Sequence, residues 1–190
     1  GKRFLVFADV YDQFVESFVS KMSALKMGDP MDETVQLGPL ATANGKRDII
    51  ELVEDAKAKG ANILCGGETP EGPGFFYPAT VIDGLTDDMR LVMEEAFGPV
   101  ASIYKVANKE EAIKIANQTT FGLSSAIWSQ DTAEQDYFVQ HLQAGAVFVN
   151  GMTISYPELA FGGIKDSGFG RELSDAGIKE FCNLKTVWKA

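Results

Sequence analysis

The sequence predicts an α/β fold with a mainly parallel sheet flanked by helices. Up to Asn150, short apolar segments alternate with amphipathic helical segments. Several of the connections between strands are long enough to hold a helix, which favours parallel pairing and right-handed crossovers. A chain of 190 residues is long enough for one domain with a sizeable core.

The first elements are a strand and a long helix. The apolar run Arg3–Phe7 predicts the strand. Asp9 can then cap a helix that continues to about Leu25, and Phe14 and Phe18 fall on one face of it, four residues apart. A second helix is predicted from about residue 44 to 59, ending at a glycine.

The middle of the chain alternates in the same way. Strands are predicted at 62–65, 77–82, 102–106, 123–128 and 146–149. Residues 66–74 lack any period and read as a loop. Asn108 with Glu111, and Asp131 with Glu134, have the spacing of a capping box, and each pair predicts the start of a helix.

After Asn150 the character of the sequence changes. Four glycines between Gly162 and Gly170 are interleaved with polar residues, which predicts a long surface loop. A short helix at about 172–181 and a final strand at 184–188 follow. A strand at the end of a chain needs a sheet edge with which to pair.

Composition excludes several classes of function. The net charge is −10, with acidic residues scattered along the chain, which disfavours nucleic-acid binding. No apolar run approaches the length of a membrane span, and no secretory signal is visible. Two cysteines are too few for a disulfide framework, so we expect a cytoplasmic protein.

The residues themselves offer little catalytic chemistry. The one histidine, His141, is interpreted as a half-buried structural side chain. Cys65 and Cys182 lack a neighbouring cation or a helix N-terminus, so we expect both to be buried, unreactive thiols. One histidine and two distant cysteines cannot assemble a metal site.

Two motifs resemble those of the aldehyde dehydrogenase family. Residues 95–100 read E-A-F-G-P-V and resemble its E-x-F-G-P-V motif, and residues 161–172 resemble its F-G-G-x-K-x-S-G-x-G-R-E loop. Residues 121–126 resemble the strand entry that the family has between them. The closing residues, and Ala160 before Phe161, resemble bacterial succinate-semialdehyde dehydrogenases.

The resemblance also implies what the chain lacks. Gly1–Phe4 resembles the residues just after the family's nucleophilic cysteine, so the nucleophile, the general base and the dinucleotide-binding domain are expected upstream. No residue here is therefore assigned as catalytic. Residues 1–181 are expected to form the C-terminal part of the catalytic domain. Residues 182–190 are expected to form an oligomerisation strand, which implies a homodimer or homotetramer.

Four residues are candidates for binding. By resemblance, Glu95 accepts hydrogen bonds from the nicotinamide ribose and Phe97 backs the nicotinamide. Phe161 and Ser155 line the aldehyde tunnel. The alternatives are an exposed acid for Glu95, a core aromatic for Phe97 and for Phe161, and a solvated turn for Ser155. The glycine-rich loop is interpreted as a structural crossing between domains rather than a phosphate cradle.

The function implied is oxidation of an aldehyde, succinate semialdehyde by the branch resembled, to its acid through a cysteine thiohemiacetal. The cofactor is NAD or NADP, and the residues that discriminate between them are expected upstream. The 190 residues alone are expected to be inactive. A non-catalytic structural or interaction module of the same fold is the alternative.

Overall fold

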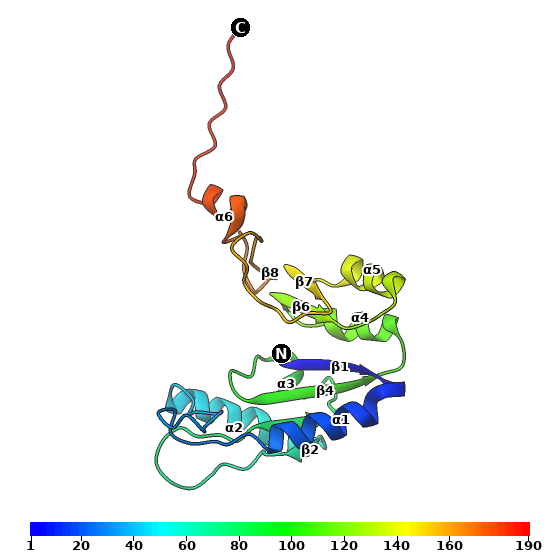
Figure 1. The fold of residues 1–190 in the computed structure, drawn as a ribbon, viewed down its shortest axis with the longest axis vertical. Coiled ribbons are helices and arrows are strands. Elements are labelled where there is room, and N and C mark those ends of the chain that lie inside the picture. The colour runs from blue at the N-terminus through cyan, green and yellow to red at the C-terminus, as the bar shows by residue number, and fades with distance from the viewer. The chain divides into compact units, whose positions relative to one another are not determined.

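The structure is a computed structural model that describes residues 1–190 (Figure 1). The chain divides into two compact units, Gly1–Asn108 and Lys109–Ala190, called unit 1 and unit 2 below. Each unit is α/β, as the sequence predicts. None of the helices is long and apolar enough to cross a bilayer.

Unit 1 is a four-stranded sheet with helices on both faces. Its strands are β1 (Arg3–Phe7), β2 (Asn62–Cys65), β3 (Thr80–Asp83) and β4 (Val100–Val106), and its helices are α1 (Ala8–Ser23), α2 (Ala43–Ala58) and α3 (Arg90–Met93). The strand order is β1-β4-β3-β2. β4 pairs in parallel with both β1 and β3.

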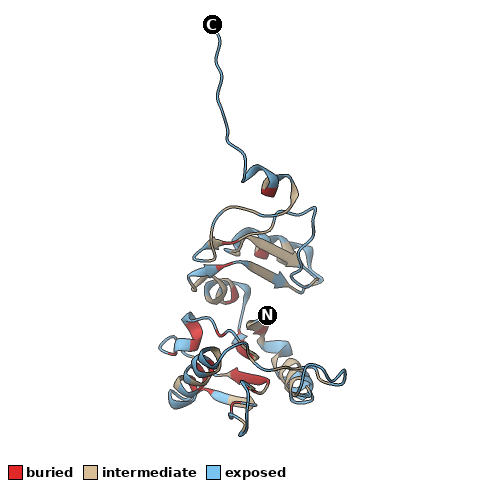
Figure 2. Cartoon of the chain, turned by 90° about the vertical axis from the view of Figure 1, so that its left-hand side faces the viewer, coloured by how far each residue is buried: buried red, intermediate tan, exposed pale blue.

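The two faces of this sheet bury different helices because successive strand residues point to opposite sides. In β3, Val81 lies in one apolar cluster with the inner face of α1, which includes Phe14 and Phe18. Its neighbour Ile82 lies in the other cluster, with α2 and α3. Both side chains are fully buried, and Figure 2 shows the buried residues gathered on these elements.

One local expectation for unit 1 was wrong, and one strand pair departs from the mainly parallel pattern. Asp9 does not cap α1: the helix begins at Ala8 directly after β1, so Asp9 lies within its first turn and no side chain caps the helix. The pairing of β2 with β3 is antiparallel. No helix separates these two strands, so the chain returns by a loop and no crossover is made.

Unit 2 is built from shorter elements. Its helices are α4 (Lys109–Asn117), α5 (Thr132–His141) and α6 (Ser174–Lys179), and its strands are β5 (Phe121–Gly122), β6 (Ser124–Ile127), β7 (Ala146–Val149) and β8 (Ile164–Lys165). β6 and β7 pair in parallel around the crossover helix α5, whereas β5 and β8 pair antiparallel. The predicted strands and helices between Lys109 and Val149 are therefore all present, with shifted ends.

The predicted N-cap of α5 by Asp131 is confirmed, but the reciprocal hydrogen bond from the Asp131 N–H to Glu134 is not made. The Asp131 carboxylate accepts hydrogen bonds from the backbone N–H groups of Ala133 and Glu134. Glu134 does not reach back to the Asp131 N–H. That N–H donates to Ser129 Oγ, 3.1 Å away, and the Ser129 hydroxyl in turn donates to the Glu134 carboxylate. Ser129 thus bridges the Asp131 N–H and the Glu134 carboxylate, two groups that bond each other directly in a capping box.

The structure corrects the expected burial of Cys182 and His141, and leaves the last strand as a prediction. Cys182 is exposed rather than buried, while Cys65 is half-buried, and both are free thiols. His141 is exposed, although its ring stacks on Tyr137 at 4.2 Å and its Nδ1 lies 2.7 Å from the Tyr137 carbonyl oxygen. Residues 184–188 form no strand within the chain, because a strand needs a hydrogen-bonding neighbour. Their pairing with another copy stays a prediction.

Candidate functional site

The candidate cofactor residues lie on a short extended segment between α3 and β4. Ala96 is buried in the core of unit 1, whereas Glu95 and Phe97 on either side of it are exposed. Alternation of this kind directs residues i and i+2 of an extended segment to the same side. Phe97 is 74% exposed, so it is not a core aromatic of unit 1.

Gly98 explains why a glycine follows Phe97. A Cβ atom at Gly98 would lie 2.9 Å from two side-chain atoms of Ile49, a fully buried residue of α2. The backbone makes two successive tight turns here, because Gly98 N–H donates to the Ala96 carbonyl (3.0 Å) and Val100 N–H to the Gly98 carbonyl (2.8 Å). The segment is therefore packed directly onto α2, which fixes the direction in which Glu95 and Phe97 project.

Lys2 joins this segment to the start of the chain. Its ammonium lies 3.1 Å from Oε1 of Glu95, donates to the Ala96 carbonyl, and lies 4.1 Å from the centre of the Phe97 ring. The backbone is held as well, since Ser102 N–H donates to the Lys2 carbonyl at 2.8 Å. The parallel pairing of β1 with β4 thus brings Lys2 beside three consecutive residues that precede β4.

The two adjacent acids, Glu94 and Glu95, differ in their surroundings. Glu94 forms a two-point ion pair with Arg90, with distances of 2.7 and 2.9 Å, and this guanidinium lowers the pKa of Glu94. Glu95 pairs with Lys2 through Oε1 at 3.1 Å, and its side chain remains 38% exposed. Glu94 is therefore engaged by Arg90 at both carboxylate oxygens, whereas Glu95 is a partly exposed acid beside Lys2 and Phe97.

The two residues predicted to line the tunnel lie in unit 2. Phe161 is partly exposed, and its backbone exchanges hydrogen bonds of 2.9 and 2.8 Å with Glu172. Ser155 lies in the exposed segment between β7 and β8. Unit 2 by itself brings neither residue against a catalytic group, so their role as tunnel residues stays a prediction.

The glycine-rich loop uses its cations internally. The Lys165 ammonium donates to the carbonyls of Asn117 (2.8 Å) and Thr119 (3.1 Å). The Arg171 guanidinium donates to the carbonyls of Gly163 (2.9 Å) and Gly170 (2.6 Å). Both side chains are committed to backbone carbonyls, which supports a structural loop over a phosphate cradle.

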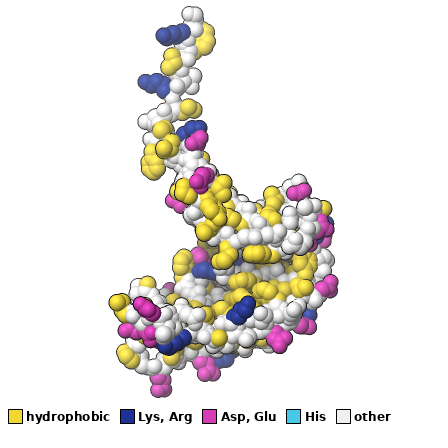
Figure 3. All heavy atoms as spheres, in the orientation of Figure 1, with side chains coloured by type: hydrophobic (Ala, Val, Ile, Leu, Met, Phe, Trp, Pro, Cys, Tyr) yellow, Lys and Arg dark blue, Asp and Glu magenta, His cyan; other side chains and the backbone are white.

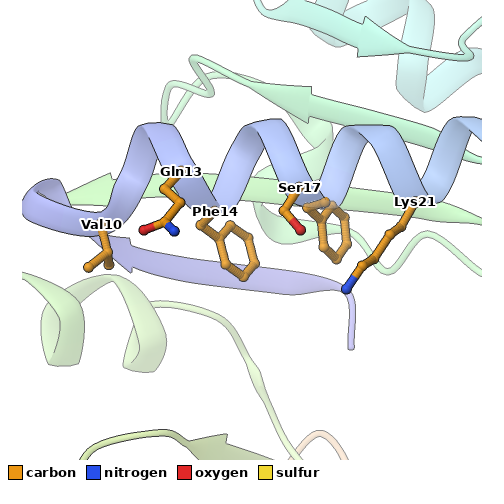
Figure 4. A pocket seen from close by; sticks show the side chains of 6 residues that line it. Val10, Gln13, Phe14, Ser17 and Lys21 are labelled. Atoms are coloured by element: carbon orange, nitrogen blue, oxygen red, sulfur yellow. The ribbon is translucent and has the colours of Figure 1, made fainter.

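An open groove of about 440 Å³ runs along α1 (Figure 4). Gln13, Ser17 and Lys21 follow one line of the helix there, with Val10 and Phe14 beside them. The groove contains no pair of acid and base groups. No cluster of three or more histidine, cysteine or acidic side chains in the molecule could hold a metal ion. The Lys2–Glu95–Phe97 cluster is therefore the best candidate site within unit 1.

The sequence names Glu95 and Phe97 as candidates but not Lys2, which the structure places beside them. The only available signal was a basic residue immediately before a predicted strand, which is common and carries no partner information. The contact depends on the register of β1 against β4, in which Arg3 lies opposite Ser102. Periodicity predicts both strands but not this register.

Comparison with known proteins identifies the family. The model of the aldehyde dehydrogenase family matches residues 1–187, so the chain belongs to this family. Succinate-semialdehyde dehydrogenase [NADP(+)] 1 of Mycobacterium ulcerans (strain Agy99) is 59% identical over 188 residues, which cover 99% of this chain and 41% of that protein. The protein of the same name from Mycobacterium tuberculosis (strain ATCC 25618 / H37Rv) is 57% identical over 190 residues, covering 100% and 42%.

Solved structures agree with this assignment. Succinic semialdehyde dehydrogenase from Streptococcus pyogenes, crystallised with NADP+, superposes with a TM-score of 0.93 at 40% identity, covering 99% of this chain and 41% of that one. Betaine aldehyde dehydrogenase from Staphylococcus aureus, in complex with NAD+, gives 0.90 at 32% identity, covering 95% and 37%. The chain thus spans about two fifths of the length of the relatives that it matches.

Proposed function

We propose that the chain is part of an NADP-dependent succinate-semialdehyde dehydrogenase, in which Glu95 and Phe97 hold the nicotinamide ribose and ring. The observation that carries the proposal is the pairing of a carboxylate and a largely exposed aromatic ring on one rigid segment. The names of the most similar relatives support succinate semialdehyde and NADP. Residues 1–181 would then belong to the catalytic domain.

The residues present fit the cofactor. The Glu95 side chain is 38% exposed beside Lys2, and an ionised carboxylate is a strong acceptor for ribose hydroxyls. The exposed face of Phe97 offers a flat apolar surface to a ring. The nicotinamide supplies a hydride acceptor when it is bound. What this chain contributes is the position of that ring and one boundary of the space around it.

Phe161 and Ser155 complete the proposal on the substrate side. A partly exposed aromatic ring and an exposed hydroxyl suit a short carbon chain that ends in a polar group. Their contribution is to admit and orient the aldehyde, while covalent chemistry belongs to residues outside this chain. Replacing Phe161 with Ala in the full-length enzyme should raise KM for succinate semialdehyde more than KM for NADP+.

Glu95→Gln in the full-length enzyme tests the cofactor role. The substitution keeps the shape of the side chain but removes its charge. Each charge-assisted hydrogen bond contributes roughly 1.5–3 kcal/mol, so the Kd for NADP+ should rise about tenfold or more. Glu94→Gln is the matched control, because Glu94 pairs with Arg90 instead. Equal NADP+ affinity in the Glu95→Gln and unaltered enzymes would refute the assignment.

We further infer that residues 182–190 pair with another copy of the chain, in a cytoplasmic homodimer or homotetramer. Leu184 and Trp188 are 100% and 83% exposed, and Figure 3 shows hydrophobic side chains along this tail. An extended apolar segment with unpaired backbone groups is a template for strand pairing. Both cysteines are free, which suits a reducing compartment. Deleting 182–190 should lower the mass in sedimentation; an unchanged mass would contradict the pairing.

A further inference from the structure

We propose that Lys2 is a positioning residue for the nicotinamide ribose: it fixes the Glu95 carboxylate and the Phe97 ring in the orientation that the cofactor needs. This inference rests on the proposed function, and assigns to Lys2 a role that acts through Glu95 and Phe97. One ammonium contacts three consecutive residues, which are Glu95 at 3.1 Å, the Ala96 carbonyl, and the Phe97 ring at 4.1 Å.

The division of the Glu95 carboxylate between two tasks is the first argument. The ion pair joins the Lys2 ammonium to Oε1 at 3.1 Å, and the Glu95 side chain stays 38% exposed. An ionised carboxylate has about four lone-pair sites, so engagement of one oxygen leaves the other able to accept ribose hydroxyls. The ammonium therefore restrains the side chain without closing the site. Without it, Glu95 would be an exposed glutamate with several rotamers, and ordering it would weaken cofactor binding.

The ring contact is the second argument. A cation within 6 Å of an aromatic centroid is attracted to the face of the ring. Phe97 is 74% exposed and has little side-chain packing to fix its rotamer, so the Lys2 ammonium at 4.1 Å is a main restraint on it. Because the same ammonium also holds Glu95, the carboxylate and the ring are oriented together.

The anchoring of Lys2 is the third argument. A lysine can orient a neighbour only if its own backbone is held. Ser102 N–H donates to the Lys2 carbonyl at 2.8 Å, and the following residues of β1 pair with β4 over five positions. The Lys2 and Glu95 side chains are each 38% exposed, so the pair is partly shielded from solvent. The sheet thus holds the backbone of Lys2, so its ammonium can restrain the side chains of Glu95 and Phe97.

The test is a double-mutant cycle on NADP+ binding in the full-length enzyme, measured by isothermal titration calorimetry. The variants are Lys2→Met, Glu95→Gln and the double substitution. Lys2→Met keeps an unbranched side chain of nearly the same length and removes the ammonium. It should raise the Kd for NADP+ about three- to tenfold. Lys2→Met should cost clearly less affinity in the Glu95→Gln background than in the unaltered enzyme, because only its effect through Phe97 remains there.

Further variants separate positioning from a general loss of structure. Lys2→Arg keeps the cation and should recover most of the affinity. Lys57→Met, which breaks the exposed 3.6 Å pair with Glu54 elsewhere in unit 1, should leave the Kd unchanged. If Lys2→Met fails to fold, Lys2→Gln replaces it in the cycle, since its amide can still donate to the Ala96 carbonyl.

The outcomes are distinguishable. NADP+ affinity unchanged by Lys2→Met but weakened by Glu95→Gln overturns the role of Lys2 and leaves the proposed function standing. Additive effects of the two substitutions also overturn it, because Lys2 would then act independently of Glu95. Affinity unchanged by Glu95→Gln removes the proposed ribose site, and the inference about Lys2 falls with it.

Discussion

Unit 1 and unit 2 are stabilised in different ways. The buried hydrophobic residues lie almost all in unit 1, and unit 2 contributes only Ala112 and Phe138. Large hydrophobic side chains that remain exposed are concentrated in unit 2 instead, among them Trp128, Met152 and Phe181. Apolar burial therefore holds unit 1 together, whereas unit 2 depends more on its backbone.

In unit 2, backbone segments pack closely against one another at glycines, while few side chains are buried. A Cβ atom at Gly145 would lie 1.8 Å from the carbonyl oxygen of Gly162, and one at Gly162 would lie 2.6 Å from that of Gly170. Arg171 then bonds two carbonyls of the same loop. Two glycines of the family's long motif, Gly162 and Gly163, therefore serve close packing in this unit, whereas a Cβ at Gly168 would meet no atom within 4 Å. Substitutions should therefore act by different mechanisms in the two units.

The largest effect is expected from Ile82→Ala in unit 1. Ile82 is fully buried in β3, and truncating such a side chain costs about 2–5 kcal/mol because a cavity is left. The counterpart in unit 2 is Ile127→Ala in β6, a partly buried position, where about 1 kcal/mol is expected. Urea unfolding with hydrogen exchange of each unit measures both. Equal losses would contradict the contrast between the units.

Next in size is Gly145→Ala in unit 2, for which we expect a loss of about 3 kcal/mol, since overpacking against backbone cannot be relieved by a rotamer change. The control is Gly151→Ala, because the nearest atom to its Cβ would be 3.9 Å away. Hydrogen exchange should accelerate throughout unit 2 and stay unchanged in unit 1. If both glycine variants behave alike, close approach is not what stabilises unit 2.

A smaller effect is expected from the cap of α5. Asp131→Ala removes the acceptor for two backbone N–H groups and should lower the stability of unit 2 by about 1 kcal/mol. Asp131→Asn retains an acceptor and should cost less. In unit 1, Thr42 caps α2 through the Gly45 N–H at 3.0 Å, and Thr42→Ala provides the matched measurement. Thermal denaturation that shows no loss for Asp131→Ala would exclude a stabilising cap.

Local elements could be predicted from the sequence, whereas contacts between distant strands could not. Apolar runs and capping residues give most of the strands and helices of both units, because these signals are local. Lys2 and the antiparallel β2–β3 pair depend on strand register and direction, which no local pattern specifies. Cys182 was expected to be buried because small apolar side chains usually are; it lies beyond α6, where the chain offers no core to receive it.

Glu95 and Phe97 are candidates because of a motif, and the structure adds a physical reason for the spacing of that motif. Gly98 permits the segment to pack on Ile49, so Ala96 points inward and its two neighbours point outward. The motif does not specify the partner of the carboxylate. Its ion pair with Lys2 joins residues 93 positions apart in sequence, and such contacts appear only when the sheet is assembled.

The smallest expected effect is a pH dependence of unit 1. The pKa of Glu94 is lowered by hydrogen bonds from Arg90, and that of Asp55 by Lys59 and the Arg90 backbone. A carboxyl whose folded pKa lies below its unfolded value, about 3.9 to 4.3, stabilises the folded state above that value. This stability is lost as pH falls through the folded pKa. Because both groups are largely exposed, the loss should be modest and reduced by salt.

The urea midpoint of unit 1 should therefore fall slightly as the pH is lowered from about 5 to 3. Arg90→Met should flatten this dependence, because Glu94 would titrate at nearly the same pH in both states once its two-point partner is removed. Lys57→Met is the control, since it removes a cation from an exposed pair with one contact at 3.6 Å. A pH profile that is identical in the Arg90→Met variant would show that the ion pair of Glu94 with Arg90 contributes no measurable stability to unit 1.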